Sequence, residues 1–99
     1  MTHARVWKFR PPAGREAEFE QAYSGSGNWA RLFEQAPGYQ GTLLLRPCDE
    51  GGWWLTIDRW ETEAHFQGFQ DAFGVQYRGL DEELECVAGE EVFVGAFEE

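Results

Sequence analysis

The chain has 99 residues, 16% of them aromatic, and a formal net charge of −10 at pH 7. This length fits a single domain over residues 1–99 with a thin core. The acidic surplus lies in the second half, where residues 51–99 carry two basic and twelve acidic side chains, and no basic cluster occurs anywhere. These properties argue against nucleic acid and anionic membranes as partners.

Targeting signals and metal-binding motifs are not recognisable in the sequence. No apolar run is long enough to span a bilayer, and the N-terminus lacks the pattern of a secretory signal, so we expect a cytoplasmic protein. Cys48 and Cys86 have no motif spacing and are expected to be reduced thiols. Together with His3 and His65 they are too scattered for a zinc site, and no metal is expected.

The first half of the chain predicts one strand and two helices. Alternating side chains over residues 3–10 predict the strand. Residues 15–23 have helical periodicity with acidic residues near the start, and the Ser-Gly-Ser-Gly run at 24–27 interrupts that helix. Asn28 is a suitable N-cap for a second amphipathic helix, which Pro37 ends.

The second half predicts a hairpin, a long helix and a last strand. Residues 39–46 and 53–60 read as strands joined by a turn. Thr62 is a suitable N-cap for the long helix, which has a weak point at Gly74, and residues 91–97 form the last strand. The order β, α in two pieces, β, β, α, β predicts an α+β fold of the ferredoxin-like, split βαββαβ type, with helices on one side of a four-stranded antiparallel sheet.

The strand at residues 53–60 has bulky side chains on both faces. Leu55 and Ile57 suit a face covered by helices, and Arg59 shares that face, with a surface acid as its expected partner. The opposite face then carries Trp54, Thr56, Asp58 and Trp60. Two indole rings on an uncovered face predict that a second copy of the chain packs there, which gives a homodimer.

Three segments together resemble the antibiotic biosynthesis monooxygenase family in order and spacing. They are PAGREAEFEQAY after the first strand, then APGYQGTLLLR, then WLTIDRWETEAHFQGF before the long helix. The resemblance extends from roughly Val6 to Phe97. It implies a dimeric α+β barrel, in which two ferredoxin-like sheets pack face to face and each subunit keeps a pocket between its sheet and its helices. Some members oxygenate aromatic polyketides or quinols without metal or flavin, and others degrade haem, so fold alone sets only an expectation.

The haem-degrading branch resembles this chain in outline but not in its functional residues. That branch has an Asn on the first strand, and a Trp followed by a His on the long helix. The corresponding positions here hold Trp7, Phe69 and Gly79. Because the axial His ligand is absent, we expect no haem cleavage of that kind.

A cofactor-free oxygenase needs aromatic walls for a flat phenol and one or two hydrogen-bonding groups in a water-poor pocket. The expected substrate-pocket residues are Trp7, Phe9, Tyr23, Trp29, Phe33, Phe69 and Phe73. Aromatic stripes at these spacings are also typical of an ordinary core. Tyr77 and His65 are the candidate catalytic residues, and a Tyr at the edge of the core and an exposed His near a helix start are the alternative interpretations.

The sequence therefore predicts a homodimeric, cofactor-independent monooxygenase-like protein. It would act on a small aromatic or quinol substrate in a pocket between sheet and helices, with no bound cofactor or metal. The alternative is a non-enzymatic or accessory domain of the same dimeric barrel that binds a small apolar or aromatic molecule. A structural dimer with a filled core is a third hypothesis.

Overall fold

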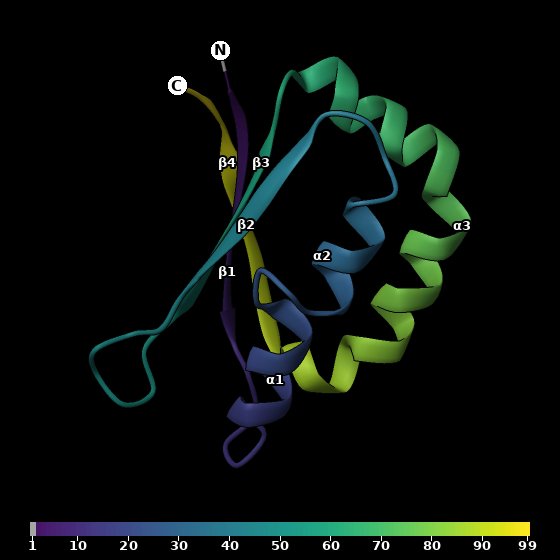
Figure 1. The fold of residues 1–99 in the computed structure, drawn as a ribbon. Helices are drawn as coiled ribbons and strands as arrows, with labels where there is room; N and C mark the ends of the chain where they lie inside the picture. Colours follow the sequence, from purple (N-terminus) through teal and green to yellow (C-terminus); the bar gives the residue numbers. More distant parts are fainter. Residues whose placement is uncertain (1) are drawn as a thin grey trace.

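The computed structural model of the protein describes residues 2–99 (Figure 1). In chain order its elements are β1 (His3–Arg10), α1 (Glu16–Tyr23), α2 (Asn28–Phe33), β2 (Tyr39–Leu45), β3 (Trp54–Trp60), α3 (Glu63–Ala88) and β4 (Glu90–Glu98). Every strand and helix predicted from the sequence is present, in the predicted order.

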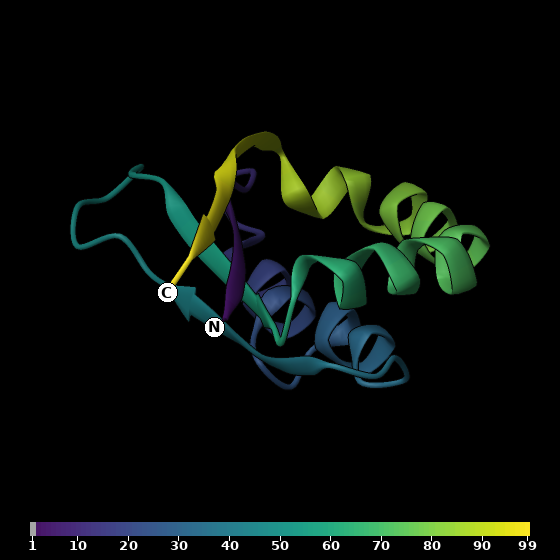
Figure 2. The same ribbon diagram turned by 90° about the horizontal axis from the view of Figure 1, so that it is seen from above.

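The strands form one antiparallel sheet in the order β2-β3-β1-β4. All three helices lie on one side of this sheet, and the other side is uncovered (Figures 1 and 2). Strands β3 and β4 both run antiparallel to β1, which lies between them, so α3 is the crossover of a split βαβ unit. The predicted α+β, ferredoxin-like arrangement is confirmed.

The core lies between the sheet and the helices, and the two Trp residues of β3 belong to it. Trp60 is fully buried and Trp54 is 5% exposed. The Trp60 ring packs against Phe33, Phe66 and Phe69 with centroid separations of 5.4–5.8 Å. The prediction that Trp54 and Trp60 lie on the uncovered face is therefore wrong.

This error has a physical cause in β3, whose two faces are both apolar. Leu55, Ile57 and Arg59 alternate with the buried residues and so lie on the uncovered face. Alternation separates two faces of a strand, but it does not tell which face the helices cover. The register with β1 identifies the covered face. Phe9 is opposite Trp54 and is only 4% exposed, so both side chains lie beneath the helices.

The uncovered face of the sheet carries a patch of apolar side chains. We call it the open face and define it by Leu43, Leu45, Leu55, Ile57, Val92 and Phe97. Leu43, Leu45, Val92 and Phe97 are each 43–53% exposed. At one end of this face the side chains of Lys8 and Arg10 lie over the ring of Trp53. A contiguous exposed apolar surface of this kind is typical of a protein–protein contact.

Helix α3 is capped at its start and bent in its middle. The Thr62 side chain accepts a hydrogen bond from the backbone N–H of His65 at 3.2 Å, which confirms the predicted N-cap. Phe73 has non-helical backbone angles (φ −119°, ψ 21°) beside Gly74, where the sequence predicts a weak point. The helix therefore runs outward from the sheet and then returns toward it (Figure 2). Tyr77 follows the bend and faces the same interior space as residues of β1 and β3.

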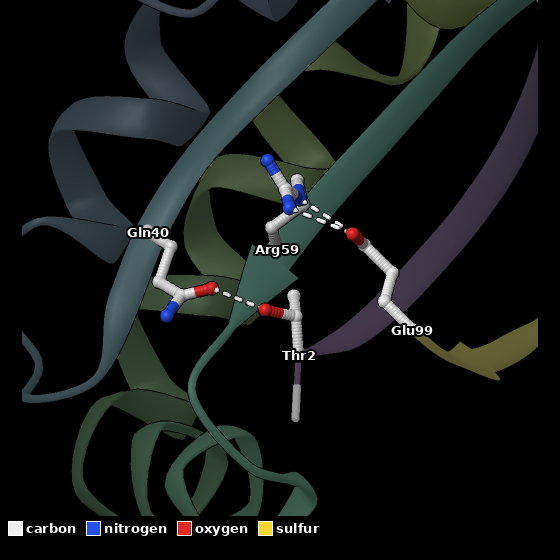
Figure 3. A network of polar contacts seen from close by, with 4 residues as sticks. All are labelled: Thr2, Gln40, Arg59 and Glu99. Carbon is white, nitrogen blue, oxygen red and sulfur yellow. Dashed lines mark hydrogen bonds and ion pairs between the residues drawn. The ribbon is translucent and has the colours of Figure 1, made fainter.

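Polar contacts join the chain termini to the neighbouring strands (Figure 3). Arg59 donates through Nε and Nη2 to the two carboxylate oxygens of Glu99 at 2.9 and 3.0 Å, and Thr2 Oγ1 donates to Gln40 Oε1 at 3.0 Å. Arg59 thus pairs with a surface acid, as expected. Both contacts are exposed, so their contribution to stability is small.

Candidate functional site

A cavity of about 120 Å³ lies between the covered face of the sheet and the helices. Strand residues form its floor, and α1, α2 and α3 supply side chains to its walls. A dry apolar cavity of roughly 150 Å³ is enough to hold benzene. The space therefore suits a ligand of about one aromatic ring.

Six aromatic side chains form most of the wall. They are Trp7, Phe9, Tyr23, Trp29, Phe33 and Tyr77, and all six are among the residues that the sequence proposes for the pocket or its chemistry. Several of these rings contact each other, with centroids 5.1 Å apart for Trp29 and Tyr77 and 4.9 Å apart for Phe9 and Tyr23. The walls are therefore packed surfaces suited to a flat, apolar ligand.

Three other candidates are not part of the cavity lining. Phe69 is 1% exposed in the core, where its ring centroid lies 5.4 Å from that of Trp60. Phe73 stacks on Phe69 at the bend of α3. His65 Nδ1 lies 2.7 Å from Thr62 Oγ1 at the start of that helix, so its contact is with the helix cap. All three precede Gly74 on α3, and the Phe69 ring still meets that of Tyr77 edge-on, with centroids 6.2 Å apart.

Asp58 is the main polar group of this site among those that the sequence pattern did not identify. It lies on the covered face in β3, and its Oδ1 accepts a hydrogen bond from Thr42 Oγ1 at 2.7 Å. Burial raises the pKa of Asp58 to about 6, and the Thr42 hydrogen bond and the charge of Arg5 act in the opposite direction. The sequence did contain a signal for this site, because Asp58 shares a strand face with two Trp residues. A carboxylate buried without a cationic partner is rare outside functional sites.

Arg5 is the basic residue that acts on Asp58. The two residues are opposite each other on β1 and β3, and the Arg5 guanidinium carbon lies 3.9 Å from the ring centroid of Phe66 and 4.7 Å from that of Phe93. Burial lowers the pKa of Arg5, and the nearby Tyr77 and Asp58 partly offset this effect. Within residues 2–99 Arg5 makes no ion pair with Asp58. The carboxylate therefore has no direct cationic partner.

The remaining polar side chains give the cavity donors and negative charge. Burial raises the pKa of Tyr23 and Tyr77, so both hydroxyls stay protonated and can donate hydrogen bonds. Asp81 and Glu91 also line the cavity, and burial raises the pKa of Glu91, with Asp81 and Glu85 adding to the effect. No Lys or Arg belongs to the lining within the described chain. The cavity therefore disfavours anionic ligands.

A larger hollow of about 770 Å³ lies outside the core and is open to solvent. It is bounded by the turn at 46–52 and by the ends of β1 and α3. Its basic residues are already paired, Arg10 with Glu90 at 2.9 Å and Arg46 with Glu20. Loop residues, many of them Pro and Gly, form most of its wall, so it lacks the convergent side chains of the inner cavity.

The described part of the chain, residues 2–99, contains no group of three or more His, Cys, Asp or Glu side chains placed to hold a metal ion. Across the same residues, none of the helices has the length and apolar character needed to cross a membrane. Cys48 and Cys86 are exposed free thiols.

SnoaB and MhuD are two of the solved structures that share this fold. SnoaB, a cofactor-independent oxygenase from Streptomyces nogalater, is 22% identical with a TM-score of 0.72, over 99% of this chain and 92% of that chain. MhuD, a heme-degrader from Mycobacterium tuberculosis with two hemes bound in its active site, is 23% identical with a TM-score of 0.70, over 98% and 94%. At such identities the likeness shows a common fold and not an activity. No curated protein matches the chain significantly.

The family itself follows from the sequence. The profile described as antibiotic biosynthesis monooxygenase matches residues 2–76, which run from β1 into the second half of α3. This span is well over half of the chain, and it contains Asp58 and most of the aromatic wall of the cavity. The chain belongs to the antibiotic biosynthesis monooxygenase family.

Proposed function

We propose that this protein is a cofactor-independent monooxygenase that acts on a small phenol or hydroquinone. The observation that carries the proposal is the position of Asp58, a carboxylate with a pKa of about 6 on the floor of a cavity walled by six aromatic rings. A base with a pKa near neutrality is suited to take a phenolic proton. The likeness to SnoaB, a cofactor-independent oxygenase, supports the same class of reaction.

The proposed reaction needs only the substrate and oxygen. Asp58 takes the proton of the phenolic hydroxyl, and the resulting anion transfers an electron to O₂. The two radicals combine, which forms a carbon–oxygen bond, and Asp58 returns its proton to the peroxide. Loss of the ring hydrogen and cleavage of the O–O bond then release water. One oxygen atom enters the ring as a carbonyl, the other leaves as water, and Asp58 ends as the carboxylate.

The cavity also restricts the substrate in size and charge. A volume of about 120 Å³ suits one ring and is well below the roughly 300–1,000 Å³ of pockets for drug-sized ligands. The carboxylates of Asp58, Asp81 and Glu91 disfavour a ring that carries an acid group. We therefore propose a neutral, single-ring hydroquinone, which should be preferred over a three-ring anthrone.

Haem degradation, the activity of MhuD, is not proposed for this chain. Trp7 occupies the β1 position where the haem-degrading branch has Asn, and Gly79 stands on α3 where that branch has its axial His. A porphyrin also requires far more room than the present cavity. Haemin with a reductant should therefore yield no bilin-type product.

We further propose that the protein is a homodimer and that the open face is its contact surface. The exposed side chains of Leu43, Leu45, Val92 and Phe97 support this assignment. It replaces the earlier expectation, based on Trp54 and Trp60, because both residues are buried beneath the helices. The cavity lies on the opposite side of the sheet, so dimer formation would leave it accessible.

Oxygen uptake with hydroquinone tests the enzymatic proposal. We expect the wild type to consume O₂ above the autoxidation rate, and Asp58→Asn to lower the catalysed rate by roughly 10²–10⁴-fold, the usual contribution of a general base. Asp71→Asn is the matched control, because Asp71 is exposed on α3 away from the cavity. A fully active Asp58→Asn variant would contradict the proposal.

Tyr77→Phe tests the second polar group of the site. It removes one hydroxyl from the cavity wall and should lower turnover by about tenfold, since a desolvated hydrogen bond is worth about 1–3 kcal/mol. The fold should be unchanged, as checked by thermal unfolding. Unchanged turnover would remove Tyr77 from the mechanism.

The alternative function is a non-enzymatic domain that binds a small apolar or aromatic molecule. The same cavity supports it, because its walls favour such a ligand whether or not turnover follows. Calorimetric binding of 4-methylphenol without any hydroquinone-dependent O₂ uptake would favour this alternative over the enzyme.

A further inference from the structure

A chain of two hydrogen bonds leads from the cavity to the edge strand β2. Thr42 Oγ1 lies 2.7 Å from Asp58 Oδ1, and the Tyr39 hydroxyl lies 2.5 Å from the same Thr42 oxygen. Asp58 and Thr42 line the cavity, whereas Tyr39 does not and packs against Trp60 with ring centroids 5.3 Å apart. Within residues 2–99 the hydrogen-bonded link from Tyr39 to Asp58 therefore runs through Thr42.

An irregularity in β2 brings these side chains together. Residues three apart in a regular strand point to opposite faces. Here the register with β3 shifts between Tyr39 and Gly41, so Gln40 is an extra residue and Tyr39 and Thr42 both face the helices. Gly41 has a φ of 124°, a backbone conformation that side chains disfavour. The bulge thus creates a hydroxyl pair that strand periodicity does not predict.

The donors and acceptors of these two hydrogen bonds follow from the number of hydroxyl protons. Thr42 has one hydroxyl proton and donates it to the Asp58 carboxylate, so its oxygen must accept from Tyr39. Burial raises the pKa of Tyr39 to about 12, which keeps this donor protonated. Oδ2, the other oxygen of Asp58, accepts no hydrogen bond from residues 2–99.

Other charged and titratable groups also face Asp58. Arg5 on β1 lowers its pKa without an ion pair. Tyr77 and Asp81 on α3 and Glu91 on β4 line the same cavity. None of these groups donates a hydrogen bond to Asp58. Within residues 2–99, Thr42 is the only hydrogen-bond donor to Asp58.

We infer that Thr42 and Tyr39 are positioning residues, whose hydrogen bonds hold one oxygen of Asp58, leave the other for the substrate hydroxyl, and keep the carboxylate ionised near neutral pH. This inference rests on the proposed function for the role of the substrate. The hydrogen-bond chain and its effect on Asp58 can be measured without any turnover. Removal of a donor to a carboxylate makes the ionised form less stable and moves its titration to higher pH.

The test is a carbon-13 NMR titration of the Asp58 carboxyl in the ligand-free protein. We expect Thr42→Val to raise the pKa of Asp58 by about one unit, equivalent to a tenfold higher proton affinity, and Tyr39→Phe to raise it by less, because its bond is one step removed. Thr42→Ser, which restores the hydroxyl, should return the pKa to the wild-type value.

Thr56→Val is the matched control. Thr56 also lines the cavity and neighbours Asp58 on β3, but it makes no hydrogen bond to Asp58. Its replacement should leave the titration unchanged. An unmoved titration in Thr42→Val, or an equal shift in Thr56→Val, would overturn the inference.

Failure of the proposed function has a different signature. If the titration shifts as expected but no variant or wild type consumes O₂ with hydroquinone, the positioning role stands and the enzymatic role falls. If turnover occurs, its pH profile in Thr42→Val should move to higher pH by the same amount as the NMR titration. A pH profile that stays fixed while the titration moves would separate Asp58 from catalysis.

Discussion

The two faces of the sheet are similar in residue type and opposite in role. The covered face carries Trp54, Trp60 and Phe9 at 5% exposure or less, and the open face carries Leu43 and Phe97 at about half exposure. The covered face also contains a carboxylate, Asp58, whereas the open face has an exposed apolar patch of Leu43, Leu45, Val92 and Phe97. A polar group retained among buried aromatic rings indicates a functional site. A patch of exposed apolar side chains without such a group indicates a contact surface for another protein.

The largest expected effect comes from the covered face. Trp60→Ala should reduce the free energy of unfolding by about 3–5 kcal/mol, because it removes a fully buried indole from the centre of the core. Urea unfolding monitored by far-UV circular dichroism measures the loss. Trp53→Ala is the matched control, since Trp53 is half-buried beneath the Lys8 and Arg10 side chains and should cost much less. Equal losses would contradict the assignment of the two faces.

Asp58 should make the covered face sensitive to pH. Its pKa in the folded protein is about 6 against an ordinary value of 3.8, so the folded state binds the proton more tightly than the unfolded state. This contribution to stability is fully present below pH 3.8 and is lost as the pH rises through 6. The difference of about two pKa units corresponds to about 2–3 kcal/mol.

Asp58→Asn should therefore be more stable than the wild type at pH 8, by about 2–3 kcal/mol, and nearly equal to it at pH 3.5. Urea unfolding at a series of pH values measures the difference, with Asp71→Asn as the control for the change in net charge. A variant that is less stable than the wild type at pH 8 would show that the ionised carboxylate is favourably paired in the folded state.

A smaller effect is expected on the open face, and on assembly instead of folding. Leu43→Lys should weaken the proposed dimer by roughly thirtyfold, or about 2 kcal/mol, because it places a charge in an apolar contact. Sedimentation velocity over a range of protein concentrations measures the change. Val75→Lys is the control, since Val75 is 73% exposed on α3. A wild-type protein that remains monomeric at micromolar concentration would contradict the dimer itself.

The secondary structure could be predicted because local signals agree with the fold. Pro11 ends β1, Thr62 caps α3, and Gly74 adjoins the bend in that helix. The family could be predicted as well, since its segments retain their order along the chain. Which face of β3 the helices cover could not be predicted, because Leu55 and Trp54 are both suitable core residues.

The candidate site could be predicted in its walls but not in its chemistry. Aromatic residues on helical stripes point to a common interior, and most of the proposed rings do line the cavity. Asp58 was assigned to the wrong face, and Tyr39 and Thr42 meet only because of the bulge before Gly41. A register shift of this kind depends on the partner strand, so the β2 sequence alone does not indicate it.

The bend in α3 also has a consequence for the room inside the protein. A straight helix of 26 residues would be about 39 Å long, which exceeds the 36 Å longest extent of the molecule. The crossover needs to cover only one strand length, about 25–30 Å, to join the end of β3 to the start of β4. The surplus of about 10 Å is accommodated because the helix arches away from the sheet and returns after Phe73 (Figure 2). A shorter helix lying flat on the strands would occupy the space of the cavity, so the length of the crossover helps to set the size of ligand that fits.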